Sequence, residues 1–303
     1  MKCGIVDLGS NTIRLSIYHW EGRQFKLLMN KKEMAGLAGY IKDGVLSDRG
    51  ILVACQVLAG FKSLLENFDI RDIHVFATAS LRNIVNTEDA LDTIRAVTGM
   101  TVEVVSGSDE ATFSFLGATV GGGAPATGLL ADIGGGSTEL VSYEKGIITS
   151  GCSLPMGSLS LFTKYVSGLF PTREERHAIR DQVEAELERA KTAGVRSAHL
   201  TGVGGTIRAA AKLCNDLSGA DQNNRTIPAE EIRALYKDLK KGDQATLRQI
   251  LRTVPDRVHT ILPGLAILNA VLKSYEVETV LVSPCGVGEG YLLQRVMGVN
   301  GHE

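Results

Sequence analysis

The chain has 303 residues, of which 44% are hydrophobic and 22% are charged. That length suffices for two domains, each with a hydrophobic core. A formal net charge of −2 argues against a general nucleic-acid binder, and no apolar run approaches the roughly 20 residues that span a bilayer. Met1 leads into an apolar strand without a charged and then apolar leader. We therefore expect a cytoplasmic globular protein that binds neither nucleic acid nor membrane.

The five cysteines (Cys3, Cys55, Cys152, Cys214 and Cys285) are isolated from one another, and no C-x-x-C pair occurs. This spacing is typical of buried, reduced thiols in a cytosolic protein. The histidines likewise lack the H-x-x-x-H and H-E-x-x-H spacings of zinc sites.

Strands and helices alternate along the first half. Expected strands are residues 3–7, 13–20, 25–33, 73–77 and 101–105, and expected helices are residues 49–68, 87–98 and 108–120. In the first helix the apolar residues that recur near the helical period are Leu52, Cys55, Val57, Leu58, Phe61, Leu64 and Leu65. Ser47 and Asp48 stand where a helix cap belongs.

A Gly121-Gly122-Gly123-Ala124-Pro125 run then breaks the pattern, and we expect a hinge or linker there. Expected strands after it are residues 128–132, 138–143, 146–151, 198–200 and 279–282. Expected helices are residues 158–166, 172–193, 206–213, 229–240, 245–253, 264–275 and 286–297. The alternation predicts an α/β protein with domains at residues 1–124 and 125–303. We leave open whether the last helix packs back on the first domain.

Two segments resemble copies of one phosphate-binding motif. The first runs from Asp7 through Gly9-Ser10-Asn11-Thr12, and the second runs from Asp132 through Gly134-Gly135-Gly136-Ser137-Thr138. Each reads as an apolar strand that ends in Asp, a tight turn and a second apolar strand. Backbone N–H groups and hydroxyls suit phosphate oxygens, and a carboxylate suits a hydrated divalent cation. The copies lie 125 residues apart, so the repeat is a whole domain.

A third glycine-rich turn, Gly202-Val203-Gly204-Gly205-Thr206, separates an expected strand from an expected helix. The N-terminus of that helix would offer N–H groups to an anion. Ile207 replaces the last glycine of a dinucleotide fingerprint, and the chain contains no G-x-x-x-x-G-K-[ST] loop.

Five motifs in order resemble the exopolyphosphatase / guanosine pentaphosphate phosphohydrolase (Ppx/GppA) family, within the actin-like, sugar-kinase and Hsp70 superfamily. They are Asp7–Thr12, Ala77–Arg82, Ser106–Ala111, Asp132–Glu139 and Gly202–Thr206. Weaker similarity continues through Leu154–Gly157, Pro263–Leu268 and Val282–Gly290. The resemblance covers nearly the whole chain.

The resemblance implies two ribonuclease-H-like (actin-like ATPase) domains with an active site in the cleft between them. It implies Glu110 as the general base that activates water, and Asp7, Asp132 and Glu139 as holders of Mg²⁺ or another divalent cation. It further implies a phosphate cradle with Arg82 as a cationic partner. The cradle residues are Gly9, Ser10, Asn11, Thr12, Gly134, Gly135, Gly136, Ser137, Thr138, Gly204, Gly205 and Thr206. A homodimer is an expectation that rests on the family alone.

The chain departs from the family pattern at four positions, where Thr112, Ser160, His259 and Gly288 stand in place of three arginines and one acid. If those arginines bind phosphates, their loss weakens the grip on a long polyanion more than the chemistry. If they pair with the acid instead, the departures say nothing about the substrate.

We expect a hydrolase that releases terminal phosphate from inorganic polyphosphate, including short chains, or from guanosine pentaphosphate. One alternative is an actin-like ATP-dependent kinase, because the Gly202–Thr206 turn resembles that superfamily's adenosine-side loop. Another is a non-catalytic sensor that keeps the same cleft.

Overall fold

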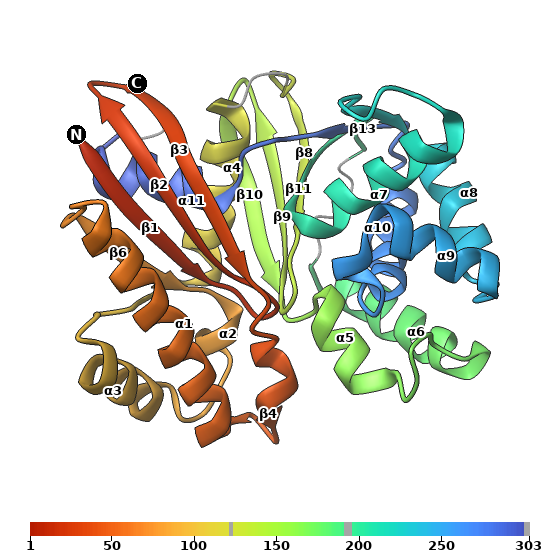
Figure 1. The fold of residues 1–303 in the computed structure, drawn as a ribbon. Coiled ribbons are helices and arrows are strands. Elements are labelled where there is room, and N and C mark those ends of the chain that lie inside the picture. The colour runs from red at the N-terminus through yellow and green to blue at the C-terminus, as the bar shows by residue number, and fades with distance from the viewer. Residues whose placement is uncertain (121–123, 191–195, 300–303) are drawn as a thin grey trace. The chain divides into compact units, whose positions relative to one another are not determined.

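The computed structural model describes residues 1–120, 124–190 and 196–299. The chain forms two compact units (Figure 1), one of Met1–Glu110 with a C-terminal segment that begins at Tyr291, and one of Ala111–Gly290. It passes between the units inside helix α4 (Gly107–Val120) and again after Gly290. The predicted boundary at residues 124 and 125 lies beyond the end of α4. Gly121–Gly123 of the predicted hinge lie outside the described residues.

The first unit contains a five-stranded sheet in the order β3-β2-β1-β6-β7. Its strands are β1 (Lys2–Leu8), β2 (Ile13–Glu21), β3 (Gln24–Glu33), β6 (Ile73–Ala77) and β7 (Glu103–Val104). Its helices are α1 (Asp48–Asn67), α2 (Ala79–Arg82) and α3 (Thr87–Thr98), and a short excursion holds η1 (Leu37–Tyr40), β4 (Ile41–Lys42) and β5 (Val45–Leu46). The first three strands pair antiparallel, whereas β6 and β7 pair parallel.

The core of this unit joins α1 and α3 to one face of the sheet. Cys55, Leu58, Phe61 and Leu65 of α1 are buried there as predicted, and the Ser47 hydroxyl caps the helix by accepting from the Gly50 amide. The prediction that Leu52 faces the core is wrong, because its side chain is 52% exposed. Ile51 takes the core position instead, since the buried stripe of α1 passes one residue earlier at this turn.

The second unit contains a six-stranded sheet in the order β10-β9-β8-β11-β13-β12. Its strands are β8 (Gly128–Ile133), β9 (Thr138–Glu144), β10 (Ile147–Leu154), β11 (His199–Val203), β12 (Thr226–Pro228) and β13 (Thr279–Val282). Its helices are α5 (Ser158–Tyr165), α6 (Arg173–Ala190), α7 (Gly204–Ser218), α8 (Ala229–Leu239), α9 (Gln244–Thr253), η2 (Pro255–Arg257), α10 (Ile261–Ser274) and α11 (Val287–Tyr291), which leads into the π-helix η3 (Leu292–Val296) of the first unit.

Strand β8 of this unit is buried on both faces. Leu129, Ala131 and Ile133 join the core formed with α5, α6, α7, α8 and α10, whereas Leu130 faces the opposite side and packs with Phe115 of α4. Successive side chains of a strand point to opposite faces, so a continuous apolar run indicates helices on both sides.

Both sheets begin with three antiparallel strands and continue with parallel ones, and the second sheet ends with β12, which pairs antiparallel with β13. This shared order confirms the predicted α/β class and the repeat of a ribonuclease-H-like unit. The sequence did not predict the short strand β12. Helix α10 begins at Ile261 rather than Gly264, because Pro263 lies in the first turn, where a helix needs no N–H donor. The predicted helix 172–193 ends at Ala190 in the described part, and residues 191–193 lie outside it.

All five cysteines are free thiols. Burial raises the pKa of Cys3 and of Cys214 to about 12, so neither thiol ionises at neutral pH. Among the described helices, none is both long enough and apolar enough to cross a bilayer.

Candidate active site

The two predicted Asp turns close with the same backbone hydrogen bond. The Gly9 amide donates to the Thr12 carbonyl at 3.2 Å, and the Gly134 amide donates to the Ser137 carbonyl at 3.0 Å. In each turn the closing glycine lies two residues after the aspartate that is the second-last residue of the first strand of its unit. The structure therefore shows one turn geometry at both copies.

In the second unit the N-terminus of α5 holds this turn from one side. The Gly134 carbonyl accepts from the Ser158 amide, and the Gly135 carbonyl accepts from the Leu159 and Ser160 amides, each at 2.9 Å. In a trans peptide the C=O and the following N–H point in opposite directions. The N–H groups of Gly135 and Gly136 consequently point away from α5.

Gly157, directly before α5, permits this close approach. A Cβ at this position would lie 2.4 Å from the carbonyl carbon of Gly135. Because that neighbour is backbone, the loop could not yield without moving as a whole. Thr138, at the end of the turn, is fully buried, and its hydroxyl donates to the Met156 carbonyl.

The turn of the first unit has the same kind of support. The Ser10 and Asn11 carbonyls accept from the Ala38 and Gly36 amides at 3.0 and 2.9 Å, so the following N–H groups of Asn11 and Thr12 point to the other side. Ser10 and Asn11 are buried, and within the described residues the Asn11 Nδ2 atom has no hydrogen-bond partner. A buried amide donor without a partner is costly and marks a place where a ligand would supply an acceptor.

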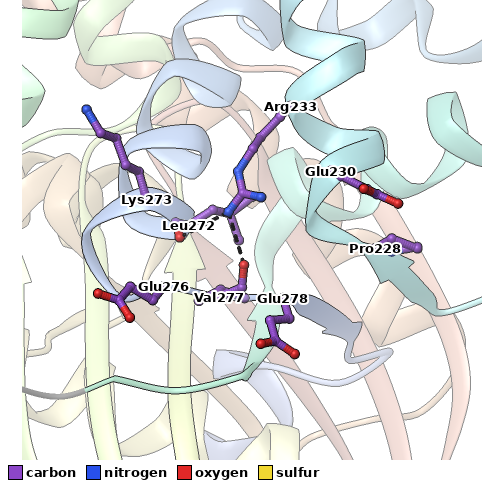
Figure 2. Close-up of a pocket in the computed structure, with 8 residues that line it drawn as sticks. All are labelled: Pro228, Glu230, Arg233, Leu272, Lys273, Glu276, Val277 and Glu278. Carbon is purple, nitrogen blue, oxygen red and sulfur yellow. Dashed lines mark hydrogen bonds between the residues drawn. The ribbon is translucent and has the colours of Figure 1, made fainter.

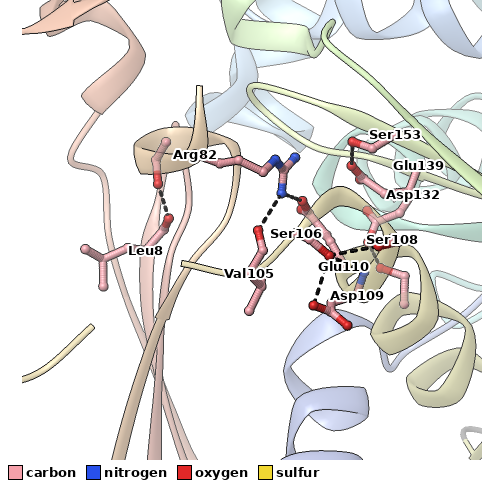
Figure 3. Close-up of polar contacts among 12 residues, drawn as sticks. Leu8, Arg82, Val105, Ser106, Ser108, Asp109, Glu110, Asp132, Glu139 and Ser153 are labelled. Atoms are coloured by element: carbon pink, nitrogen blue, oxygen red, sulfur yellow. Dashed lines mark hydrogen bonds and ion pairs between the residues drawn. The ribbon is translucent and has the colours of Figure 1, made fainter. Parts of the chain in front are cut away.

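Asp132 and Glu139 lie directly opposite each other on the antiparallel strands β8 and β9. They are only 7% and 1% exposed. Ser114 donates to Asp132 Oδ2 at 2.6 Å, and Ser153 donates to Glu139 Oε1 at 2.7 Å. Figure 3 shows these two carboxylates with Ser153. Like charges that are directly opposite in an antiparallel pair repel, so this pair favours a cation beside it.

The residues present fit a magnesium ion by the chemistry of their donors, since Mg²⁺ prefers carboxylate oxygens and water. Asp132 and Glu139 belong to the second unit, and Asp7 belongs to the first. Asp7 of β1 lies opposite Arg14 of β2 in the antiparallel register. Inside either unit, the described residues contain no group of three His, Cys, Asp or Glu side chains placed to hold a metal. That Asp7 acts together with the other two carboxylates stays a prediction.

Glu110 lies in the first turn of α4, and it is 7% exposed. Arg82, the last residue of α2, donates from Nη1 to Glu110 Oε2 at 2.7 Å and to the Val105 carbonyl at 3.2 Å (Figure 3). The Ser80 hydroxyl in the same short helix donates to the Leu8 carbonyl at the end of β1. The first unit thus brings Arg82 and Glu110 together, with α2 attached to the strand that leads into the first turn. A charge-assisted hydrogen bond of this kind fixes the direction of a carboxylate.

The third glycine-rich turn lies beside Asp132. Strand β11 pairs parallel with β8 so that Val203 is opposite Asp132, and Gly204 follows with a φ of +91°. A Cβ at Gly204 would lie 2.6 Å from Asp132 Oδ1. Thr206 is buried in the first turn of α7. The second unit therefore joins the predicted Asp132 and Gly204–Thr206 elements at one edge of its sheet.

Arg257 was not predicted as a site residue, yet its guanidinium lies against this turn. A Cβ at Gly205 would be 2.2 Å from Arg257 Nη2, and the arginine side chain is only 14% exposed. The sequence contained one indication of this residue's importance, because Arg257 stands where the family pattern also has an arginine. Its contact with Gly205 joins segments too distant in sequence for any local pattern to reveal.

Two of the departures from the family pattern have visible roles. Ser160 caps α5, since its hydroxyl accepts from the Gly157 amide at 2.8 Å. His259 packs with the Phe162 ring, with centroids 5.2 Å apart. Burial and then the neighbouring Arg257 charge lower the pKa of His259, against an opposing effect of Asp256. Ser160 and His259 are therefore both uncharged at neutral pH; Ser160 belongs to α5 of the second unit, and His259 contacts this helix.

A hollow of about 580 Å³ opens elsewhere in the second unit and contains none of the predicted residues (Figure 2). Arg233 donates there to the Leu272 and Val277 carbonyls, and Glu276 pairs with Arg196 at 3.3 Å. Arg233 and Glu276 of this hollow are thus engaged by other groups of the protein.

The chain is similar to known proteins in both sequence and structure. The sequence profile of the Ppx/GppA phosphatase family matches residues 16–297. Exopolyphosphatase 1 of Mycobacterium bovis is 25% identical over 305 residues, covering 98% of this chain and 88% of the relative. The crystal structure of an exopolyphosphatase from Cytophaga hutchinsonii is 24% identical, with a TM-score of 0.86 and complete coverage of both chains. The Aquifex aeolicus member of the family is 26% identical, with a TM-score of 0.78 and 98% coverage of both.

The profile match extends over nearly the whole chain, and the solved structures share its two-sheet fold. The chain belongs to the Ppx/GppA phosphatase family, and it is a hydrolase of the class that acts on phosphoric anhydrides.

Proposed function

We propose that this protein releases the terminal phosphate of inorganic polyphosphate by attack of water on the phosphoanhydride chain. The observation that carries the proposal is the contact between Glu110 and Arg82, which lie 2.7 Å apart in the first unit. A carboxylate held in one direction can accept the proton of an attacking water once the water lies within hydrogen-bond reach. Glu110 is therefore the general base of this proposal.

Phosphoryl transfer needs charge neutralisation and positioning more than covalent chemistry from the protein. The outward N–H groups of Gly135 and Gly136 in one unit, and of Asn11 and Thr12 in the other, supply donors for phosphate oxygens. Arg257 adds a fixed positive charge beside Gly205. These groups would bind the terminal phosphates and aim the last one at the water.

Magnesium is the cation that we propose for Asp132 and Glu139, with Asp7 as the contribution of the first unit. It would neutralise phosphate charge when bound. The two buried carboxylates would hold it, and Ser114 and Ser153 would keep them oriented through hydrogen bonds of 2.6 and 2.7 Å. This role accounts for two like charges that face each other inside the protein.

Polyphosphate is favoured over guanosine pentaphosphate because the relative from Mycobacterium bovis is an exopolyphosphatase. Short chains are favoured because Ser160, which stands where the family pattern has an arginine, is used as a helix cap. It does not add the positive charge that a long polyanion would need along its path. We propose short-chain polyphosphate as the preferred substrate.

The test is a comparison of phosphate release in magnesium from short-chain polyphosphate, long-chain polyphosphate, guanosine pentaphosphate and ATP. The proposal expects the largest kcat/KM for short-chain polyphosphate. A preference for guanosine pentaphosphate would overturn the substrate but not the reaction. ATP consumption that requires an acceptor would indicate a kinase, and tight polyphosphate binding without release would indicate a sensor.

A further inference from the structure

The C-terminal segment contacts the connection between β7 and α4, which leads directly to Glu110. Tyr291 begins this segment and is 4% exposed. Its ring stacks on Phe76, with centroids 4.5 Å apart and planes at 15°, and its hydroxyl donates to Glu103 Oε2 at 2.7 Å. Phe76 is on the face of the sheet opposite to α1, since its neighbours Val75 and Ala77 join the α1 core. Tyr291 therefore anchors the segment to the sheet.

One turn later, Arg295 of the π-helix η3 spans both ends of the same connection. Its Nε lies 3.2 Å from Glu103 Oε1, and its Nη2 lies 3.7 Å from Asp109 Oδ2. Glu103 is the first residue of β7, and Asp109 directly precedes Glu110. A single guanidinium thus ties the strand to the first turn of α4.

The residues between these ends are themselves held by hydrogen bonds. The Asp109 amide donates to Ser106 Oγ at 3.0 Å, and the Ser106 hydroxyl donates to Asp109 Oδ2 at 2.9 Å. The Glu110 amide donates to the Ser106 carbonyl at 2.9 Å. Figure 3 shows Asp109, Ser106 and Glu110 as one connected group, with Arg82 on the other side of Glu110. A shift of Asp109 would consequently turn the backbone that carries Glu110.

We propose that Arg295 is a positioning residue for the hydrolysis, and that it holds the first turn of α4 so that Glu110 keeps the direction needed to take a proton from water. The inference rests on the proposed function. Arg295 acts through Asp109 and Glu103, with Tyr291 as the anchor that brings it there. Catalytic groups work only within narrow limits of distance and angle, and a misplacement of about 1 Å costs up to roughly 100-fold in rate.

Stability and positioning make different predictions for this arginine. The Arg295 side chain is 40% exposed, and its partners Glu103 and Asp109 are 39% and 43% exposed. Exposed ion pairs contribute little to folding stability. Removal of Arg295 should therefore leave the melting temperature and substrate binding almost unchanged while it lowers kcat.

The experiment compares Arg295→Met, Arg295→Lys and a matched control, Arg252→Met. Arg252 pairs with Asp216 at 2.5 Å and is 71% exposed, so the control removes an exposed ion pair that belongs to the second unit, whereas Glu110 belongs to the first. We expect kcat for short-chain polyphosphate to fall about tenfold in Arg295→Met, with KM within twofold of the wild type. Arg295→Lys should recover part of the loss, and Arg252→Met should keep wild-type kcat.

A second measurement needs no substrate. Amide hydrogen exchange at residues 107–113 should be faster in Arg295→Met than in the wild type and unchanged in Arg252→Met. If wild-type protein releases phosphate and Arg295→Met keeps the wild-type kcat and the wild-type exchange rate, the inference about Arg295 is overturned while the proposed function stands. A rise in KM with constant kcat would also overturn it, because Arg295 would then act in binding. If wild-type protein releases no phosphate from any substrate, the proposed function fails, and the positioning role of Arg295 fails with it.

Discussion

Arg82 donates a hydrogen bond of 2.7 Å to Glu110, and the two side chains are only 17% and 9% exposed. The pair joins the short helix α2 to the first turn of α4 across 28 residues of sequence. A buried ion pair of this kind is costly to break from one side, since the remaining charge stays in a poorly solvated place.

This pairing predicts that Arg82→Met lowers the free energy of unfolding by about 3 kcal/mol and abolishes phosphate release. Adding Glu110→Gln to the same chain should recover most of the stability, because no unpaired carboxylate is left, without any recovery of activity. Urea denaturation of the two single variants and the double variant measures the coupling. If the effects on stability simply add, the two side chains are not coupled.

The opposed carboxylates of Asp132 and Glu139 predict a link between stability and magnesium. Asp132→Asn should raise the free energy of unfolding in EDTA by up to about 1 kcal/mol, because it removes a like-charge contact. The same change should abolish the stabilisation that magnesium gives to the wild type. Asp181→Asn, at a site where Asp181 is 64% exposed and pairs with Arg180, is the control and should leave the magnesium effect intact. An unchanged magnesium effect in Asp132→Asn would place the cation elsewhere.

Gly157→Ala should destabilise the protein by roughly 1–3 kcal/mol, because its Cβ would meet the backbone of Gly135 at 2.4 Å. It should also raise the KM for polyphosphate, since the Gly135 and Gly136 amides would be displaced. The matched control is Gly60→Ala in α1, where a Cβ meets no atom within 4 Å; there alanine should stabilise the helix by up to about 1 kcal/mol. Thermal melts and initial rates of both variants test the contrast.

His259 predicts a loss of stability in mild acid. Its pKa in the folded protein is below the ordinary value of 6.5, so below about pH 6.5 the unfolded chain takes up a proton more readily than the folded one. Stability is therefore full above that pH and falls as the pH drops toward the lowered pKa. His259→Gln should flatten this part of the pH profile by less than about 1 kcal/mol. A wild-type profile that rises toward acid pH in this range would contradict the lowered pKa.

Much of this arrangement could be predicted from local sequence. The Asp7 and Asp132 turns were recognisable because strand, aspartate and small turn residues are neighbours in the chain, and their shared closing bond confirms the repeat. The helix cap at Ser47 and the helix that begins near Glu110 follow from equally local rules. Leu52 was placed wrongly, because apolar character alone does not fix which side of a helix the core touches.

Other features depend on contacts between segments that are distant in sequence. The hydrogen bond between Tyr291 and Glu103 joins residues that are 188 positions apart in the sequence, and no sequence periodicity predicts it. The contact between Arg257 and Gly205 likewise forms only when η2 packs against α7, so local sequence could not predict it. The cap that Ser160 forms on α5 explains one departure from the family pattern. From the sequence alone, this departure was visible only as a missing arginine.

The most direct test of the proposed reaction is single-turnover phosphate release from short-chain polyphosphate by wild-type protein and by Glu110→Gln, with polyphosphate binding measured on the same samples. Glu110→Gln keeps the size of the side chain and a hydrogen-bond acceptor for Arg82, but removes the base. We predict that release falls by roughly 100-fold to 10,000-fold while the dissociation constant stays within a few fold. Release at the wild-type rate by Glu110→Gln would contradict the role of Glu110 as the base that activates water.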